Sequence, residues 1–525
     1  MNQIHVLDCT LRDGGYCNNW EFGYENKRKI LKGLIEADLD VIECGFLTNK
    51  IVYDQNGTKF TNLSEISEIL PTDRKGKIFV AMVNFGEYDL EKLPCYDGTS
   101  IDGIRVAFHK KDREKALEWC RIIGDKGYKV YIQPMVTISY TDGEFLELIQ
   151  KSNELEPEAF YVVDSFGFMR KKDLLRLFRT VEKNLKEGIK IGFHSHNNMQ
   201  LAYANAQTLE ELETSRDIII DTSVMGMGRG AGNLNTELFV EYLNEERGKK
   251  YDLKPLLILI DEVLSNFYDE NYWGYSLPNY LSAKYATHPN YAGYLDDKKT
   301  LTYEDMNAIF SNMEEDKRVY FDKEYMEQLY NAYMRRGEAK KERLEEVHKN
   351  LKGKKVLLVA PGKSAEDEKD KIIACSQQPD VVTMEINFKY QYIDTDYLFL
   401  SNLRRYRNME QVEMKKAIVT SNILSDDGGI KTDYAELLNA NEYVKDNAGM
   451  MAVKFLIQME AAEIMIAGMD GYSHNEELNY MNKEVQMNIK KNVADQMNRG
   501  MEEVLRDLSR EIPITFVTEP KYIRI

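Results

Sequence analysis

The stretch Lys190-Ile191-Gly192-Phe193-His194-Ser195-His196 is a short apolar run that ends in two histidines one residue apart. Runs of this length and composition are typical of buried strands. Alternate residues of a strand point to the same side, so both imidazoles can reach one point in space. Seven similar runs precede or follow it with amphipathic stretches between them: His5–Leu11, Val41–Phe46, Ile78–Val83, Gly103–Phe108, Lys129–Val136, Phe160–Ser165 and Ile218–Val224.

Strand runs that alternate with helical stretches indicate βαβ units and a parallel sheet. Eight units are the number that a (β/α)8 TIM barrel needs, whereas a doubly wound open sheet is the competing interpretation. The positions of the polar residues favour the barrel, because a barrel builds its active site at the carboxyl ends of its strands. Seven polar residues lie within or just after those ends: Asp8, Arg12, Asp13, Glu43, Ser165, His194 and His196.

The rest of the chain predicts further structure of a different kind. Residues 237 to about 295 are helical and rich in aromatics, and about 303 to 350 are highly charged at helical spacing, as in exposed helices that join two domains. Strand-like runs resume at Lys354–Ala360, Val381–Asn387, Tyr397–Leu400, Ala417–Thr420 and Ile464–Ala467. We therefore expect a catalytic barrel over 1–236, a helical extension and linker over 237–352, and a second α/β, Rossmann-like domain over 353–525.

Composition narrows the class of protein. The 525 residues include 69 basic and 87 acidic side chains, and the net charge of -18 disfavours binding to nucleic acid or to an anionic membrane. The six cysteines show no Cys-x-x-Cys spacing, so we expect reduced thiols. With no export signal and no apolar run of the roughly 18 residues that a span needs, we expect a cytoplasmic protein.

The two histidines and the carboxylate of Asp13 form a candidate metal site. Neutral imidazole is a good ligand for zinc, manganese or cobalt, and a carboxylate adds a hard oxygen. Arg12, next to Asp13, would stay charged and could stabilise an enolate oxyanion. The plainer alternatives are two satisfied polar histidines, Asp13 as a helix N-cap, and Arg12 paired with Glu43.

Four motifs taken together resemble the DRE-TIM metallolyase superfamily of aldolases and acyltransferases, also called HMGL-like. They are Leu7-Asp8-Cys9-Thr10-Leu11-Arg12-Asp13-Gly14, Asp164-Ser165-Phe166-Gly167, His194-Ser195-His196-Asn197-Asn198 and the glycine-rich stretch Gly226–Asn233. The resemblance implies Asp13, His194 and His196 as ligands of a divalent metal (Mn, Mg, Co or Zn), with Asn233 as a further ligand. It also implies Arg12 as the enolate stabiliser, Glu43 as its support, and Ser165 as a hydrogen-bonding partner of the substrate.

Within this superfamily the sequence most resembles 4-hydroxy-2-oxovalerate aldolases, some of whose relatives look like parts of surface-polysaccharide pathways. We therefore expect a 2-oxo acid such as pyruvate and an aldehyde as substrates. Those aldolases usually carry a histidine where this chain has Tyr16, so Tyr16 is the first candidate for proton transfer and His288 the alternative. A Claisen-type acyltransferase that uses an acyl-CoA, and a non-catalytic barrel that acts as a scaffold, stay open as competing interpretations.

The second domain faintly resembles bacterial sialyltransferase-like and other Rossmann-type domains over Asn447–Ala452 and Ile464–Tyr472. The turn at Pro361–Ser364 could offer backbone amides to a phosphate, although it lacks the full spacing of a nucleotide triphosphatase loop. We therefore expect a nucleotide-linked ligand in this domain, and a homo-oligomer for the whole protein.

Overall fold

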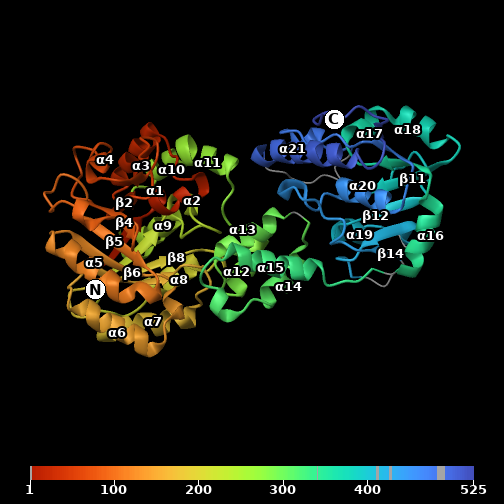
Figure 1. Cartoon of the computed structure of the whole chain (residues 1–525). Coiled ribbons are helices and arrows are strands. Elements are labelled where there is room, and N and C mark those ends of the chain that lie inside the picture. The colour runs from red at the N-terminus through yellow and green to blue at the C-terminus, as the bar shows by residue number, and fades with distance from the viewer. Residues whose placement is uncertain are drawn as a thin grey trace. The chain divides into compact units, whose positions relative to one another are not determined.

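The computed structural model describes residues 3–298, 300–339, 341–409, 413–424, 429–481 and 491–524. The chain forms two compact units (Figure 1). The first, which we call the barrel unit, comprises Met1–Tyr294 and Met313–Phe321, and the second comprises Leu295–Asn312 and Asp322–Ile525. No helix in the described part of the chain is long and apolar enough to span a membrane.

In the described residues of the barrel unit, eight parallel strands close on themselves, because β1 pairs with both β2 and β9. The closed sheet confirms the predicted (β/α)8 barrel. The short strand β3 (Lys59–Phe60) extends it beside β2. The barrel strands are β1 (Ile4–Asp8), β2 (Val41–Leu47), β4 (Ile78–Asn84), β5 (Gly103–Phe108), β6 (Lys129–Pro134), β7 (Ala159–Asp164), β8 (Lys190–Ser195) and β9 (Ile218–Thr222).

Amphipathic helices surround the strands and bury one large apolar cluster against them (Figure 1). They are α3 (Tyr24–Glu36), α4 (Leu63–Ser67), α5 (Arg113–Asp125), α6 (Asp142–Asn153), α7 (Lys171–Asn184), α8 (Ala202–Glu210) and α9 (Thr236–Arg247). A smaller cluster of inward-pointing side chains, which includes Leu7, Val80, Tyr131 and Tyr161, fills the barrel interior. The barrel is therefore a packed core and not a pore.

The first strand is shorter than the run predicted from His5 to Leu11. It ends at Asp8, whose carboxylate accepts a hydrogen bond from the backbone N–H of Thr10. The chain then turns into α1 (Thr10–Asp13) and α2 (Gly15–Asn18). Arg12 and Asp13 therefore lie on a helical turn directly after the strand, and not on the strand itself.

The boundaries between the two units fall within the region 237–352, which was expected to be a helical extension and linker. Helices α10 (Leu253–Leu259), α11 (Ser265–Glu270) and α12 (Leu277–Lys284) belong to the barrel unit, and α13 (Pro289–Asp297) crosses the boundary at Tyr294. Helices α14 (Tyr303–Ser311) and α15 (Lys323–Met334) belong to the second unit. They bury apolar side chains such as Phe310 and Met326, and Tyr330 donates a hydrogen bond to Asp446. Helices α14 and α15 therefore bury an apolar face within the second unit, although their sequence is highly charged.

The second unit contains a parallel sheet in the order β14-β13-β12-β11-β10-β15-β16. Strands β11 to β14 follow one another on one side of β10, and β15 and β16 lie on its other side. This order is typical of Rossmann-like folds. Strands β14 and β16 were not predicted, because each has only three residues. The strands are β10 (Lys355–Val359), β11 (Val381–Ile386), β12 (Tyr397–Leu400), β13 (Ala417–Thr420), β14 (Ile430–Thr432), β15 (Glu463–Ala467) and β16 (Ile514–Phe516). The helices of this unit that accompany the sheet are α16 (Lys341–Leu351), α17 (Lys363–Asp367), α18 (Lys369–Ser376), α19 (Leu403–Arg407), α20 (Ala448–Gln458) and α21 (Lys491–Leu508).

Candidate metal centre

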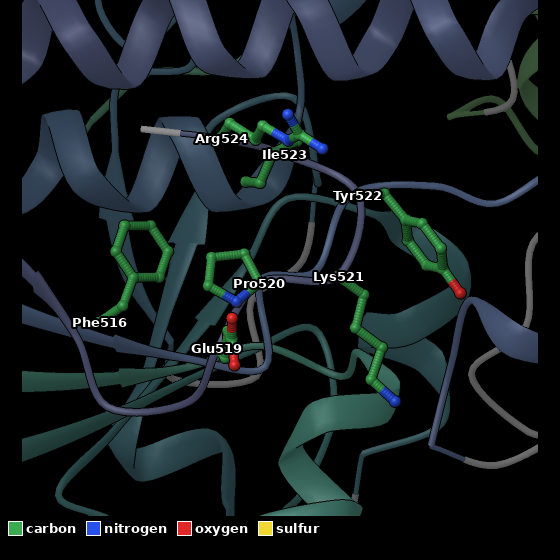
Figure 2. Close-up of a pocket in the computed structure, with 7 residues that line it drawn as sticks. All are labelled: Phe516, Glu519, Pro520, Lys521, Tyr522, Ile523 and Arg524. Carbon is green, nitrogen blue, oxygen red and sulfur yellow. The ribbon is translucent and has the colours of Figure 1, made fainter.

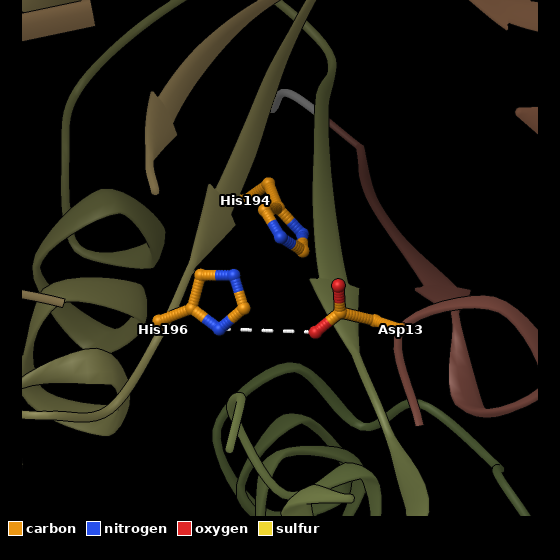
Figure 3. Close-up of side chains that lie close together, drawn as sticks. All are labelled: Asp13, His194 and His196. Carbon is orange, nitrogen blue, oxygen red and sulfur yellow. Dashed lines mark ion pairs between the residues drawn. The ribbon is translucent and has the colours of Figure 1, made fainter. Parts of the chain in front are cut away.

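Asp13, His194 and His196 meet at the carboxyl ends of the barrel strands (Figure 3). One ligand atom of each lies within 4.8 Å of the others, and all three side chains are buried. His194 and His196 come from the end of β8, and their rings are 5.2 Å apart and nearly perpendicular. Nδ1 of His196 lies 3.7 Å from a carboxylate oxygen of Asp13. Two nitrogens and one oxygen therefore converge on one point, as a divalent metal requires.

The surroundings hold these groups in the protonation states of metal ligands. Burial by itself would raise the pKa of Asp13, but the charge of Arg12 and the nearby imidazoles lower it below its usual value. Burial lowers the pKa of His196 to about 3, against the opposing effect of Asp13. At neutral pH the cluster therefore offers an ionised carboxylate and a neutral imidazole, both ready to coordinate a cation.

Unpartnered buried atoms test whether a metal fits here. Nδ1 of His196 and Oδ1 of Asn233 are buried and have no hydrogen-bond partner among the described residues. An unpaired buried polar atom costs free energy, so its retention calls for a partner. A divalent cation is such a partner for the imidazole nitrogen beside Asp13, and the residues present fit this group.

A chain of buried charges supports the cluster from inside the barrel. The Nδ1 atom of His194 lies 2.9 Å from the carboxylate of Asp221, which leaves Nε2 as the nitrogen for a metal. Asp221 also pairs with Arg105, whose Nη1 lies 2.8 Å from Glu43. Glu43 in turn accepts a hydrogen bond of 2.8 Å from Nε of Arg12.

Sequence reasoning missed two members of this chain, Arg105 on β5 and Asp221 on β9. Both are almost completely buried. The available signal was a charged residue inside an otherwise apolar strand run, which is expensive to bury unless it is paired. Arg105 spans the barrel interior to reach both carboxylates, so it links the support of Arg12 to the support of His194.

Arg12 has one guanidinium nitrogen to spare. Its Nε contacts Glu43 and its Nη1 contacts Asp13, whereas its Nη2 is buried with no hydrogen-bond partner among the described residues. Burial by itself would lower the pKa of Arg12, but the carboxylates of Glu43 and Asp13 raise it above the usual value. A fixed cation with an unused donor therefore lies beside the metal ligands.

Asn233 lies in the glycine-rich stretch after β9, and its amide nitrogen is 2.8 Å from a carboxylate oxygen of Asp13. As placed, Asn233 orients Asp13. Gly228 of the same stretch packs directly on this pair, since a Cβ there would lie 2.3 Å from Nδ2 of Asn233 and 2.7 Å from the carboxylate of Asp13. Only glycine leaves room at that position.

The remaining predicted site residues lie around the cluster at different depths. Ser165 is buried and accepts a hydrogen bond from the N–H of Val136, which leaves its own hydroxyl proton to donate. Tyr16 is 41% exposed, and its ring lies against the guanidinium of Arg229. Burial of the phenol raises the pKa of Tyr16, and Arg229 opposes this rise. His288 lies farther out, with its ring beside Phe166 and Phe321.

The comparisons with known proteins converge on one family. The model of the HMGL-like family matches residues 96–261, which lie in the barrel unit. Over these residues the barrel unit is similar to the HMGL-like family. A 4-hydroxy-2-oxovalerate aldolase from Geobacillus genomosp. 3 is 27% identical over 46% of this chain and 70% of the relative. An oxaloacetate decarboxylase from Mycobacterium tuberculosis is also 27% identical over 46% of this chain and 70% of its own length.

Among solved structures, the N-terminal domain of an aldolase from Bacteroides vulgatus is similar, with a TM-score of 0.48 and 26% identity, over 57% of this chain and 98% of that one. The curated relatives are aldolases and a decarboxylase, so they favour a metal-dependent carbon–carbon lyase over the acyl-CoA-dependent alternative. The buried Asp-His-His cluster of the barrel therefore fits a divalent metal, as does the match to the HMGL-like family model.

In the second unit, two of the three backbone N–H groups of the turn at Pro361–Ser364 already have partners. The N–H of Gly362 donates to the carbonyl of Gly468, and the N–H of Ser364 donates to the carboxylate of Asp470 at 2.7 Å. A phosphate at this turn would meet the negative charge of Asp470. These contacts disfavour the expected phosphate site at this turn.

A hollow of about 640 Å³ lies elsewhere in the second unit, beyond the end of β16 (Figure 2). Its lining consists of Phe516 and the segment Glu519–Arg524. The backbone N–H of Tyr522 donates to the carbonyl of Asp470, which places the segment next to the loop that follows β15. Ligands of open α/β sheets commonly bind at the carboxyl ends of the strands.

Proposed function

We propose that this protein is a divalent-metal-dependent carbon–carbon lyase that acts on a 2-oxo acid and an aldehyde. The observation that carries the proposal is the unused Nη2 of Arg12 beside the converging ligand atoms of Asp13, His194 and His196. A ligand cluster alone would fit many metalloproteins. A buried cation with a spare donor at the same place is what an enolate chemistry needs.

In the proposed reaction, a 4-hydroxy-2-oxo acid loses its hydroxyl proton and its C3–C4 bond breaks. The products are an aldehyde and the enolate of pyruvate, which takes up a proton at C3. A divalent metal (Mn, Mg, Co or Zn) held by Asp13, His194 and His196, with Asn233 as a further ligand, would supply Lewis-acid polarisation of the 2-oxo group. Arg12 stabilises the negative charge that develops on the enolate oxygen, and Glu43 holds the guanidinium in place.

In the condensation direction, the aldehyde oxygen must receive a proton as the new bond forms. Tyr16 suits this role because its raised pKa keeps the phenol protonated at neutral pH, so it acts as an acid and not as a base. Ser165 has a hydroxyl proton free for the substrate. His288 is the alternative proton-transfer residue, as the base that takes the hydroxyl proton in the cleavage direction. Burial lowers its pKa to about 3, so its ring is neutral at physiological pH.

The direct test is metal content together with exchange of the methyl protons of pyruvate in deuterium oxide. We expect bound divalent metal and metal-dependent exchange for the wild type, and loss of both for His194→Ala. His474→Ala is the matched control, because His474 is an exposed histidine of the second unit. Bound metal without exchange in the wild type would contradict the 2-oxo acid, and absence of metal would favour the scaffold interpretation.

For the second unit, we propose a nucleotide-linked ligand in the hollow shown in Figure 2. Supporting features are its place beside the carboxyl ends of β15 and β16 and the aromatic and basic side chains of Tyr522 and Arg524. Isothermal titration of the full chain with cytidine and uridine phosphates tests this. We expect binding that Tyr522→Ala weakens, whereas Tyr443→Ala, at another exposed tyrosine of the unit, leaves it unchanged. Equal binding by both variants would contradict the proposed place.

A further inference from the structure

Arg229 is a basic residue that the proposed reaction does not use. It lies in the glycine-rich stretch after β9, where its backbone N–H is 3.4 Å from the carboxylate of Asp13. Its Nη2 donates to the backbone carbonyl of Ser165 at 2.9 Å, and its guanidinium lies 5.3 Å from the ring of Tyr16. The side chain therefore borders the metal cluster on the side where Tyr16 reaches solvent.

No carboxylate of the described residues contacts the guanidinium of Arg229 directly, although its charge helps to lower the pKa of Asp13. Among the residues that the structure describes, the side chain of Arg229 forms no ion pair, and its Nε is buried without a hydrogen-bond partner. The protein carries a net charge of -18, so acidic side chains outnumber basic ones, yet Arg229 forms no ion pair among the described residues. Holding a half-buried guanidinium without a counter-charge costs free energy, and a bound anion would offset that cost.

Two histidines lie close to Arg229 and come from separate parts of the barrel unit. His109 directly follows β5, and His288 directly precedes α13. The ring of His288 contacts Phe166, the neighbour of Ser165, at 5.7 Å. The ring of His109 contacts Tyr320 at 4.9 Å, and His288 contacts the adjacent Phe321 at 6.0 Å. We call Arg229, His109 and His288 the mouth cluster.

The electrostatics tie the mouth cluster together. Burial lowers the pKa of both histidines, and the positive charge of Arg229 lowers both further. The acidic groups that act nearby are Asp112 on His109, and Asp13 and Glu87 on Tyr16. Glu87 already pairs with Lys50 at 3.2 Å. The cluster therefore consists of one permanent cation and two neutral imidazoles that can donate hydrogen bonds.

We infer that the mouth cluster binds an anionic group on the aldehyde substrate, either a carboxylate or a phosphate, through the guanidinium of Arg229. This inference rests on the proposed function, because it names the class of the second substrate. In the proposed reaction, the 2-oxo acid is bound by Arg12 and by the metal that Asp13, His194 and His196 would hold, all of which are buried. The guanidinium of Arg229 lies 5.3 Å from the ring of Tyr16, where the aldehyde oxygen receives its proton in the proposed reaction, so the rest of the aldehyde can extend toward Arg229.

Condensation of pyruvate with matched aldehydes tests the inference. Succinic semialdehyde is compared with its neutral methyl ester, and glycolaldehyde phosphate with glycolaldehyde. We expect the wild type to prefer an anionic aldehyde by about 10- to 100-fold in kcat/KM, the range of one charge-assisted hydrogen-bonded contact. The pair that shows the larger preference identifies the anion as carboxylate or phosphate.

Three variants assign the preference to Arg229. We expect Arg229→Gln to abolish it, Arg229→Lys to keep part of it, and Arg28→Gln, at an exposed arginine of α3, to leave it unchanged. Retained preference in Arg229→Gln would overturn the inference, as would a rise in the KM of pyruvate alone. Partial recovery with Arg229→Lys shows that a misfolded Arg229→Gln protein is not the cause.

The two proposals fail in different ways. A wild type that exchanges pyruvate protons but uses neutral and anionic aldehydes equally well overturns the mouth cluster and leaves the lyase intact. A wild type that binds metal but shows no exchange contradicts the 2-oxo acid as the substrate of the lyase. In that case isothermal titration of the metal-loaded protein with succinate and with glycolaldehyde phosphate decides the anion site. Binding that Arg229→Gln abolishes supports it, and no binding overturns it.

Discussion

The carboxylate of Asp221 lies 2.9 Å from Nδ1 of His194, on the side of the ring that faces away from the metal cluster. This contact fixes the ring orientation and the tautomer that leaves Nε2 free for a cation. Asp221 is 2% exposed and also pairs with the buried Arg105. Asp221 therefore sets the orientation of the metal ligand His194, although Asp221 is not itself part of the metal cluster.

We predict that Asp221→Asn weakens metal binding by about 10- to 100-fold, the range seen for partners of metal-bound histidines. The amide cannot match the carboxylate as an acceptor for both the imidazole and Arg105. Competition with a fluorescent metal indicator measures the affinity. Asp217→Asn serves as the control, because among the described residues the carboxylate of Asp217 accepts a hydrogen bond only from the exposed backbone N–H of Gln3. Equal affinity of Asp221→Asn and wild type would contradict the role of the contact.

Arg12 is predicted to act through the geometry of its guanidinium as well as its charge. A lysine ammonium cannot contact Glu43 and Asp13 and still direct a donor at an oxyanion. We expect Arg12→Lys to keep its metal and to lose about 100- to 1000-fold in kcat, as for removal of one oxyanion donor. Steady-state kinetics and metal analysis of the same preparation measure both. A loss of less than about fivefold would remove Arg12 from the proposed chemistry.

Tyr16 and His288 compete for the proton-transfer role. Tyr16 lies next to the charges of Arg229 and Asp13, whereas His288 is surrounded by the rings of Phe166 and Phe321. We therefore expect Tyr16→Phe to lower kcat of condensation by about 100-fold, in the range of general acid catalysis. His288→Gln should act mainly on the KM of the aldehyde. The reverse pattern in kcat and KM would assign the proton transfer to His288.

Much of the barrel could be predicted from the sequence, because its strands are short apolar runs and their polar residues fall at one end. The strand Gly103–Phe108 was predicted to the residue. The first run was placed too long, because Asp8 draws the N–H of Thr10 into a turn that no local pattern reveals. Similarly, β14 and β16 have three residues each and leave little periodic signal.

The roles of Arg105 and Arg229 could not be predicted from the sequence for a different reason. Both depend on partners more than 60 residues away, namely Asp221 for Arg105 and the carbonyl of Ser165 for Arg229. A charge inside a strand run indicates burial but not its counter-charge. The two histidines on β8 were easier to interpret, since alternate strand residues share a face whatever surrounds them.

Gly228 is predicted to be required for the metal centre. An added Cβ would lie 2.3 Å from Asn233 and 2.7 Å from Asp13, so both side chains would have to move. We expect Gly228→Ala to lower metal occupancy at least tenfold and to destabilise the barrel unit by about 1–3 kcal/mol, as in overpacked cores. Metal analysis and thermal unfolding measure these effects. Gly143→Ala is the control, because a Cβ there meets nothing within 4 Å.

Asp8 should make the stability of the barrel depend on pH. Burial raises the pKa of Asp8 to about 6, from an ordinary value near 4, although Thr10 and Thr236 donate hydrogen bonds to it. The folded barrel therefore favours the protonated carboxyl. The stability that this preference contributes is fully present below about pH 4 and is lost as the pH rises through about 6. A shift of about two units corresponds to about 3 kcal/mol.

Asp8→Asn removes this titration, because the amide is neutral at every pH and can still contact Thr10 and Thr236. We expect the free energy of unfolding of the wild type, relative to the variant, to fall by about 3 kcal/mol between pH 4 and pH 7.5. Urea unfolding followed by tryptophan fluorescence measures this, since Trp20, Trp119 and Trp273 all lie in the barrel unit. Parallel pH profiles would show that Asp8 is ionised throughout, and that its two donors outweigh the cost of burial.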